Sequence, residues 1–163
     1  MQAAVLASVI TDLFDWLEEF SANWWFLLII FGVAFFDSVF PVVPSETTVI
    51  IGGVAAGLGE QPLWAVIVCG AVGAFLGDNT AYTIGRRMSG WISRRAAKKE
   101  SRQRRLDWAA EQIRVRGGPL LITARFIPGG RTALTVSSGI THQPRRWFMG
   151  WIAIAAAIWA TYA

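Results

Sequence analysis

Long apolar stretches, each interrupted by proline or glycine, dominate the pattern of the chain. Residues 24–40 and 47–58 are mostly apolar, and Pro41 and Pro44 lie between them. Proline lacks an amide donor and clashes with the preceding turn, so these prolines end any helix. Neither piece comfortably provides the ~20 apolar residues of a membrane-crossing helix. We therefore expect two half-length helices in a re-entrant hairpin, whose broken backbone is buried in protein or lines a polar cavity.

A full membrane-spanning helix follows. It is predicted over residues 63–86, begins after Pro62, and carries Gly70, Gly73 and Gly77 at near-helical spacing. Small residues at this spacing let helices pack closely, which permits dimers without requiring them.

A second interrupted stretch resembles the first. Residues 119–127 and 132–140 are short apolar pieces on either side of Pro128, Gly129 and Gly130, and Pro144 opens the last helix. We expect a second re-entrant hairpin here, entering from the opposite face. Broken helices at corresponding positions of two inverted halves are typical of a transporter with a site near the membrane midplane.

Composition places the whole pattern in a membrane. The chain has 163 residues, is 54% hydrophobic, and has a mean hydropathy of +0.44. These values predict an all-α integral membrane protein with one membrane domain over residues 23–163. Within residues 1–22, apolar positions recur at helical spacing, with most of the acids on other faces. This segment is predicted to be an amphipathic helix on the membrane or against the bundle.

Basic residues are confined to the second half of the chain. The first is Arg86, and eleven of the fifteen fall within residues 86–116. No base-stacking or groove-reading module accompanies them, so nucleic acid is not an expected partner. The positive-inside rule instead predicts a cytoplasmic loop over residues 86–116. It also favours the second hairpin, because a simple span over residues 119–140 would leave Arg145 and Arg146 outside.

Four charged residues lie inside the two interrupted stretches: Asp37, Glu46, Arg125 and Arg131. A charge at membrane depth costs ~2.5–3.5 kcal/mol on insertion scales and therefore tends to mark a substrate or ion pathway. Two acids and two arginines on two broken segments predict one shared polar site, which indicates transport more than enzymatic chemistry.

Three runs of residues resemble the signatures of the DedA family of bacterial membrane proteins. The first is Phe36-Asp37 through Pro41 with Pro44-Ser45-Glu46, the second is Gly77-Asp78 through Tyr82 to Gly85-Arg86, and the third is Arg125 through Thr132, followed by Gly139. The family shares the VTT, or SNARE-associated-like, domain with eukaryotic lipid scramblases. Relatives often have Glu at the position of Asp37. They usually continue past the last helix with a basic tail, so we expect the chain to be part of a longer protein.

The resemblance implies opposed re-entrant hairpins and lipid movement across the bacterial plasma membrane. Undecaprenyl phosphate and phosphatidylethanolamine are substrates implicated for family members, and dependence on the proton gradient has been inferred. The family's acidic positions fall on Asp37 and Glu46, and its essential arginines on Arg125 and Arg131.

The chemistry of these residues suits a phosphate head group. Arginine can bind phosphate oxygens bidentately and stays charged, so Arg125 and Arg131 are the expected ligands. Gly129 and Gly130 would expose backbone amides beside a helix start, which adds a positive dipole end. Asp37 and Glu46 would serve as counter-ions or proton carriers. Asp78 is a further candidate, although a packing role beside Asn79 and Tyr82 is favoured slightly, and His142 is expected at the surface.

Other functions stay open at this point. Enzymatic chemistry has little support, because the chain has one histidine, no clustered aspartates, no nucleotide-binding loop and no motif that calls for a cofactor or metal. A non-transporting membrane scaffold or stress factor is the main alternative, in which each arginine only neutralises a carboxylate. A small-ion or proton exchanger is the other, because the same four charges could handle ions without any lipid.

Overall fold

The computed structural model describes residues 23–40, 45–127 and 129–163, apart from 97–99, and all of the regular structure in them is helical. The elements in chain order are α2 Trp25–Val39, α3 Ser45–Gly57, α4 Leu63–Arg87, α5 Ser89–Ala96, α6 Glu100–Arg116, α7 Gly118–Thr123, the 3₁₀ helix η1 Ala124–Phe126, α8 Gly130–Ile140 and α9 Arg145–Tyr162. The all-α prediction is confirmed for this part of the chain. The amphipathic helix predicted over residues 1–22 lies outside it.

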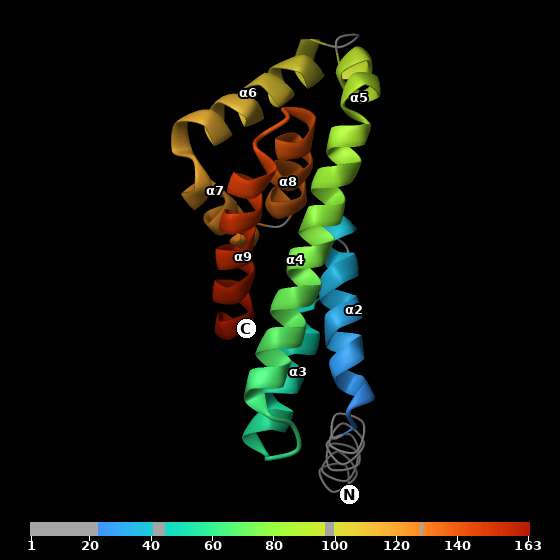
Figure 1. Ribbon diagram of the computed structural model, residues 1–163, viewed down its shortest axis with the longest axis vertical. Coiled ribbons are helices and arrows are strands. Elements are labelled where there is room, and N and C mark those ends of the chain that lie inside the picture. Colours follow the sequence, from blue (N-terminus) through green and yellow to red (C-terminus); the bar gives the residue numbers. More distant parts are fainter. Residues whose placement is uncertain (1–22, 41–44, 97–99, 128) are drawn as a thin grey trace, which may run out of the picture.

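Helix α4 is the long central element, and α2 and α3 lie beside one of its halves (Figure 1). Two glycines of α4 set its distance from α2. A Cβ atom at Gly73 would overlap the carbonyl group of Phe31, and one at Gly77 would overlap that of Phe35. The small residues therefore bring two helix backbones into direct contact, as the sequence pattern predicts.

Most of the remaining helices lie on one side of the other half of α4, and α5 continues beyond its end (Figure 1). Helices α7, α8 and α9 lie together there, and α6 crosses above them at one end of the molecule (Figure 1). Glycine again permits the contact between α8 and α4, because a Cβ at Gly139 would overlap the carbonyl of Tyr82. Gly129 has φ +71°, a left-handed conformation that glycine adopts without strain, and it precedes the first residue of α8.

The apolar core joins elements from both halves of the chain. One cluster of buried side chains draws on α2, α3, α4 and α9 and contains Phe26, Ile30, Ala34, Val49, Val66, Ala74, Ala156, Trp159 and Ala160. Outside this core, large apolar side chains such as Leu28, Val54, Val72 and Ile154 are exposed around the bundle. An outer surface of this kind is suited to contact with lipid.

Among the described helices, α4 has the length and apolar composition needed to cross a membrane, and the apolar helix α2 is shorter, at 15 residues. The span predicted over residues 63–86 matches α4 to within one residue at its end.

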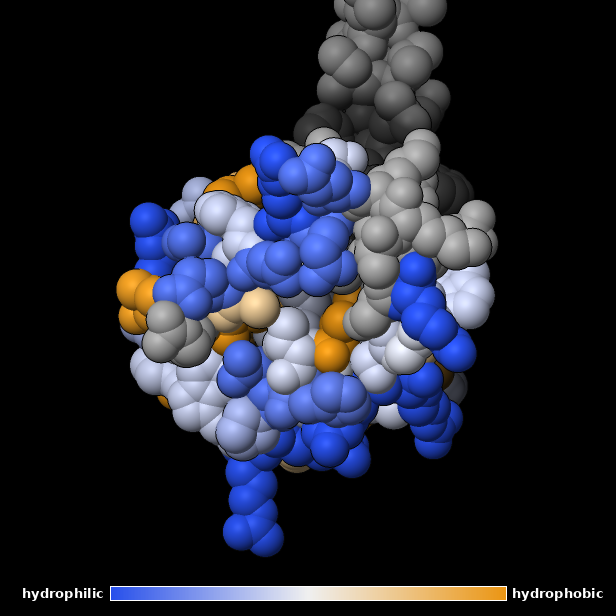
Figure 2. Space-filling model, turned by 90° about the horizontal axis from the view of Figure 1, so that it is seen from above, coloured by the Kyte–Doolittle hydropathy of each residue, from blue (hydrophilic) through white to orange (hydrophobic). Residues whose placement is uncertain are grey.

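The segment 86–116, predicted to be a loop, is largely helical. Its charged residues are good helix formers, and pairs four residues apart support α6. Arg104 pairs with Glu100, and Gln103 donates a hydrogen bond to Asp107. Ile113 is buried against the bundle, which fixes one face of α6. Viewed from this end, the surface is mainly hydrophilic (Figure 2).

Candidate functional site

Arg125 and Asp78 form a fully buried ion pair inside the bundle. Nη1 of Arg125 donates to Oδ2 of Asp78 across 2.7 Å, and the two side chains are 1% and 0% exposed. Asp78 lies in the middle of α4, and Arg125 lies in η1, directly after α7. Taking two charges out of water is expensive, so each charge needs the other at this position to offset the cost of its desolvation.

The guanidinium of Arg125 has hydrogen-bonding capacity beyond this pair. Its Nε and Nη2 atoms are buried and have no hydrogen-bond partner among the described residues, and the same holds for Oδ1 of Asp78. The guanidinium carbon lies 5.4 Å from the ring centroid of Trp159, a distance typical of a cation–π contact. Trp159 of α9 therefore covers Arg125 with an aromatic face while two donor groups stay uncommitted.

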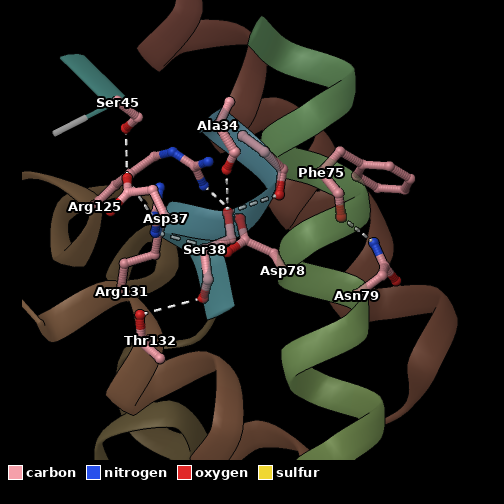
Figure 3. A network of polar contacts seen from close by, with 11 residues as sticks. Ala34, Asp37, Ser38, Ser45, Phe75, Asp78, Asn79, Arg125, Arg131 and Thr132 are labelled. Carbon is pink, nitrogen blue, oxygen red and sulfur yellow. Dashed lines mark hydrogen bonds and ion pairs between the residues drawn. The ribbon is translucent and has the colours of Figure 1, made fainter. Parts of the chain in front are cut away.

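Arg131 forms the second ion pair, from the first turn of α8. Its Nη2 donates to Oδ2 of Asp37 across 2.8 Å, and its Nε lies 3.8 Å from Oδ1 of Asp78. Asp78 is thus shared between the two arginines, with its two oxygens directed to different partners. Figure 3 shows the four side chains converging from α2, α4, η1 and α8. Two arginines and two aspartates make a charge-balanced centre.

Hydroxyl groups surround the Asp37 side of this centre. Oγ of Ser45, the first residue of α3, donates to Oδ2 of Asp37 across 2.5 Å. On the next residue of α2, the Ser38 hydroxyl lies within hydrogen-bond distance of the carbonyls of Ala34 and Ala74 (Figure 3). Thr132 donates to the Ser38 carbonyl across 3.3 Å. These contacts join the end of α2 to the start of α3, which follows it in the chain, and to the start of α8, which is more than 90 residues away.

The structure brings together three of the four charges predicted to share a site: Asp37, Arg125 and Arg131. Glu46 is exposed in the first turn of α3, and no hydrogen bond or ion pair between described residues joins it to either arginine. An acid in this position is stabilised by the positive end of the helix dipole, which accounts for Glu46 without a partner in the site. Its proposed role in proton coupling stays a prediction.

Asp78, and not the predicted Glu46, is the second acid in contact with the arginines. The sequence slightly favours a packing role for Asp78 beside Asn79 and Tyr82, whereas the structure places it against both arginines. The sequence does contain a signal that Asp78 faces the interior of the bundle. Asp78 lies on the stripe of small residues formed by Gly70, Ala74, Gly77, Ala81 and Gly85, all of them buried. A carboxylate on such a stripe must face the protein interior and needs a buried cation there.

The turn between η1 and α8 includes the two glycines expected to expose backbone amides. Gly129 is exposed, and Gly130 is the first residue of α8. A Cβ at Gly130 would lie 3.1 Å from the carbonyl oxygen of Ala124 and 3.0 Å from Cβ of Ile127, so this turn is tight. The Gly130 amide donates to the carbonyl of Ile127 across 2.9 Å, so it is not free to bind an oxyanion as the structure stands. Anion binding by the start of α8 stays a prediction.

His142 lies in a different cluster, beyond the end of α8. It is exposed, as predicted, and its Nε2 lies 3.2 Å from the Ser89 hydroxyl. In the same region the Tyr82 hydroxyl donates to the carbonyl of Gln143 across 2.6 Å and accepts from Arg86. These contacts tie the end of α4 to the connection between α8 and α9. Within the described part of the chain, no group of three or more His, Cys, Asp or Glu side chains could hold a metal ion.

Comparison with known proteins places this site in a family context. The family model described as VTT domain matches residues 43–163. An uncharacterized membrane protein of Synechocystis is 29% identical over 146 residues, which cover 88% of this chain and 66% of that protein. Protein DedA of Escherichia coli K12 is 29% identical over 147 residues, which cover 85% of this chain and 67% of that protein.

A relative from Mycobacterium leprae, also named an uncharacterized membrane protein, is 27% identical over 121 residues. These residues cover 74% of this chain and 54% of the relative. The chain thus spans about two thirds or less of the length of these relatives. No solved structure matches the chain significantly.

Proposed function

The chain belongs to the DedA family of VTT-domain membrane proteins, and from this premise we propose that it carries a phosphate-bearing lipid across the bacterial plasma membrane. The family match and its relatives' names support a bacterial membrane protein. The substrate, the transport step and the multi-pass arrangement in the inner membrane are parts of the proposal, as is the cytoplasmic position of residues 86–116.

The observation that carries the proposal is the convergence of Arg125 and Arg131 on Asp78 in the interior of the bundle. Asp78, which contacts both, lies nine residues before the end of α4, or about 14 Å along the helix axis. If Arg87 marks the membrane surface, the arginines lie near the middle of the ~30 Å hydrocarbon core. Charges at this depth are costly and are typically retained for a substrate or ion pathway.

Arginine is well matched to a lipid phosphate. A phosphate that crosses the bilayer unpaired pays a large desolvation cost, and a guanidinium can offset this cost with two parallel hydrogen bonds. The buried Nε and Nη2 atoms of Arg125, which have no partner among the described residues, form one such edge. Arg131 lies in the first turn of α8, where the helix dipole adds a further attraction for an anion.

The helix lengths support a pair of opposed re-entrant hairpins around this site. Helices α2 and α3 have 15 and 13 residues, or about 23 and 20 Å, which is short of a full crossing. On the other side of the site, α7 with η1 and then α8 are likewise two short helical segments with a break between them. We propose that these pairs are the inverted repeats of a transporter, with the substrate site between their tips.

Proton coupling is proposed as the energy source. Binding of an anionic phosphate adds negative charge to a neutral centre of two arginines and two aspartates. Protonation of one carboxylate would restore the balance in the low-dielectric interior. Asp37 and Glu46 are the candidate carriers, since both lie beside the interruption between α2 and α3. Protons and lipids are therefore the expected partners, and a homo-oligomer is compatible with the exposed apolar surface.

Lipid exchange in proteoliposomes tests the proposal. Purified protein would be given undecaprenyl phosphate or a labelled phospholipid, with and without a pH gradient. Arg131→Gln should reduce lipid movement about tenfold or more, because a hydrogen bond to a charged group is worth about 1.5–3 kcal/mol. Arg104→Gln is the matched control, because Arg104 is highly exposed in α6, and it should transport like the wild type.

Two outcomes would favour other functions. Proton or anion flux without lipid movement would identify a small-ion exchanger. The absence of all flux, with the wild type and Arg131→Gln equally inactive, would favour a membrane scaffold. Glu46→Gln separates coupling from binding, because it should transport lipid yet no longer respond to the gradient if Glu46 carries the proton.

A further inference from the structure

The two ion pairs of the site differ in burial and in how tightly their residues are packed. We infer that Asp37 is a resident ligand of Arg131 that an incoming phosphate displaces, and that Ser45 is the positioning residue that holds Asp37 in place. This inference rests on the proposed function and adds a mechanism for occupying the site when no substrate is bound. The pair of Arg125 and Asp78 stays intact throughout.

The Arg125–Asp78 pair is fixed by its surroundings. Asp78 directly follows Gly77, where the backbones of α4 and α2 touch, and Gly73 makes the same close contact one turn earlier. The carboxylate is 0% exposed, and Arg125 lies beneath Trp159. Moving Asp78 away would separate two packed helices, so its carboxylate cannot readily exchange for another anion.

The Arg131–Asp37 pair is more open. Asp37 is 17% exposed and lies in the last turn of α2, close to the interruption that precedes α3. Arg131 is 9% exposed and lies at the start of α8. Both contacts of the Asp37 carboxylate, to Arg131 and to Ser45, use the single oxygen Oδ2. A small rotation of one side chain at the end of a helix would therefore release Arg131.

Ser45 is placed to control this release. It is buried at 2% exposure, and its hydroxyl donates to Asp37 from the opposite side of the interruption between α2 and α3. Hydrogen bonds to a carboxylate are stronger than those between neutral groups. Ser45 thus fixes the carboxylate in the position where it neutralises Arg131. The same hydrogen bond joins the two halves of the first hairpin.

Carboxylate and phosphate compete for the same donors. In the observed state Nη2 of Arg131 donates to Asp37 and its Nε lies 3.8 Å from Oδ1 of Asp78, so carboxylates already face the edge that would bind a phosphate bidentately. A phosphate that takes over these donors must displace Asp37 and so break or rearrange its contact with Ser45. Occupation of the anion site is in this way coupled to the connection between α2 and α3.

Equilibrium binding of dodecyl phosphate tests the inference. The full-length chain, purified in a neutral maltoside detergent, would be titrated with dodecyl phosphate, with dodecanol as the uncharged control. Ser45→Ala should bind dodecyl phosphate about 3- to 10-fold more tightly than the wild type, because the competing carboxylate is held less firmly. Ser45→Thr keeps the hydroxyl and should bind within about twofold of the wild type. Asp37→Asn should bind at least about tenfold more tightly.

The double variant distinguishes positioning from a general structural effect. If Ser45 acts through Asp37, Ser45→Ala should change binding little in the Asp37→Asn background. An equal effect in both backgrounds, or unchanged or weaker binding by folded Ser45→Ala, would overturn the inference. If Ser45→Ala does not fold, Asp37→Asn alone decides, since unchanged or weaker binding excludes a competing carboxylate.

Failure of the proposed function would look different. In that case the wild type would bind dodecyl phosphate no better than dodecanol, or Arg131→Gln would bind it as the wild type does. Binding that depends on Arg131 but is insensitive to Ser45 and Asp37 would leave the proposed function standing and overturn only the resident-ligand inference.

Discussion

Asp78 and Arg125 lie 47 residues apart in the sequence and form an ion pair at 2.7 Å with almost no exposed surface. The pair joins the central helix α4 to the interrupted segment that precedes α8. A buried pair of this kind contributes modestly as long as both partners are present, but removal of one leaves a buried charge uncompensated. The stability of the site therefore depends on Asp78 as much as on the arginines.

Asp78→Asn should lower the free energy of unfolding by about 3–5 kcal/mol, because it leaves Arg125 charged and unpaired in the interior. Denaturant or thermal unfolding in detergent measures this change. Asp107→Asn is the control, because Asp107 is exposed in α6 and accepts a hydrogen bond from Gln103. The Asp78→Asn/Arg125→Met double variant should recover much of the loss. A loss of less than about 1 kcal/mol for Asp78→Asn would show that the pair is not a structural element.

Gly77→Ala should destabilise the contact between α2 and α4. The added methyl group overlaps the carbonyl of Phe35, and overpacking of this kind costs about 1–3 kcal/mol. Gly32→Ala provides the comparison, since nothing lies within 4 Å of a Cβ at that position and alanine favours a helix by up to about 1 kcal/mol. Unfolding measurements should therefore show a lower free energy of unfolding for Gly77→Ala and a higher one for Gly32→Ala. Equal effects would contradict the close packing of these helices.

Trp159→Leu should destabilise the protein, because it removes the aromatic face that contacts the guanidinium of Arg125. The expected loss of stability is about 1–3 kcal/mol, from the cation–π contact together with lost packing. Trp159→Phe keeps an aromatic ring and should lose less. The same ordering should appear in the affinity for dodecyl phosphate if Arg125 binds the head group. Leucine and phenylalanine variants of equal stability and affinity would exclude a role for the ring.

Exchange of the charges at positions 37 and 131 separates a transporter from a scaffold. The Asp37→Arg/Arg131→Asp double variant retains an ion pair but moves the guanidinium from α8 to α2. A static scaffold needs only the pair, so its cellular function should return in the double variant. A transporter needs the guanidinium at the start of α8, so lipid movement should stay at least about tenfold below the wild-type rate. Complementation and lipid exchange on the same variants decide between the two.

Much of the fold follows from local signals in the sequence. In the sequence, Pro41, Pro44 and the run Pro128-Gly129-Gly130 predict the interruptions, because proline and glycine act directly on the local backbone. Pro62 marks the start of α4 for the same reason, whereas Arg86 and Arg87 mark its other end because cations are favoured at the negative end of the helix dipole. The helices of the basic segment are not predicted by its charge density, which indicates topology; the sequence signal for them is its content of helix-forming residues.

The site was predictable in part. Charges within apolar segments identified Asp37, Arg125 and Arg131 without any knowledge of tertiary contacts. Which acid pairs with which arginine depends on how α2, α4 and α8 pack, and spacing along the chain does not contain that information. The stripe of small residues on α4 indicates that Asp78 faces the interior, but its arginine partner and the hydrogen bond between Ser45 and Asp37 depend on tertiary packing. The direction of each side chain decided these contacts.

Lipid exchange by proteoliposomes containing Arg131→Lys, compared with the wild type and the exposed-site control Arg104→Lys, is the most direct test of the transport proposal. Lysine keeps the charge but loses the planar, bidentate donor geometry of arginine. We expect Arg104→Lys to move lipid like the wild type and Arg131→Lys to be about tenfold slower or worse while remaining folded. Wild-type rates of lipid movement in folded Arg131→Lys, or no lipid movement by the wild-type protein, would contradict a phosphate-binding arginine at the start of α8.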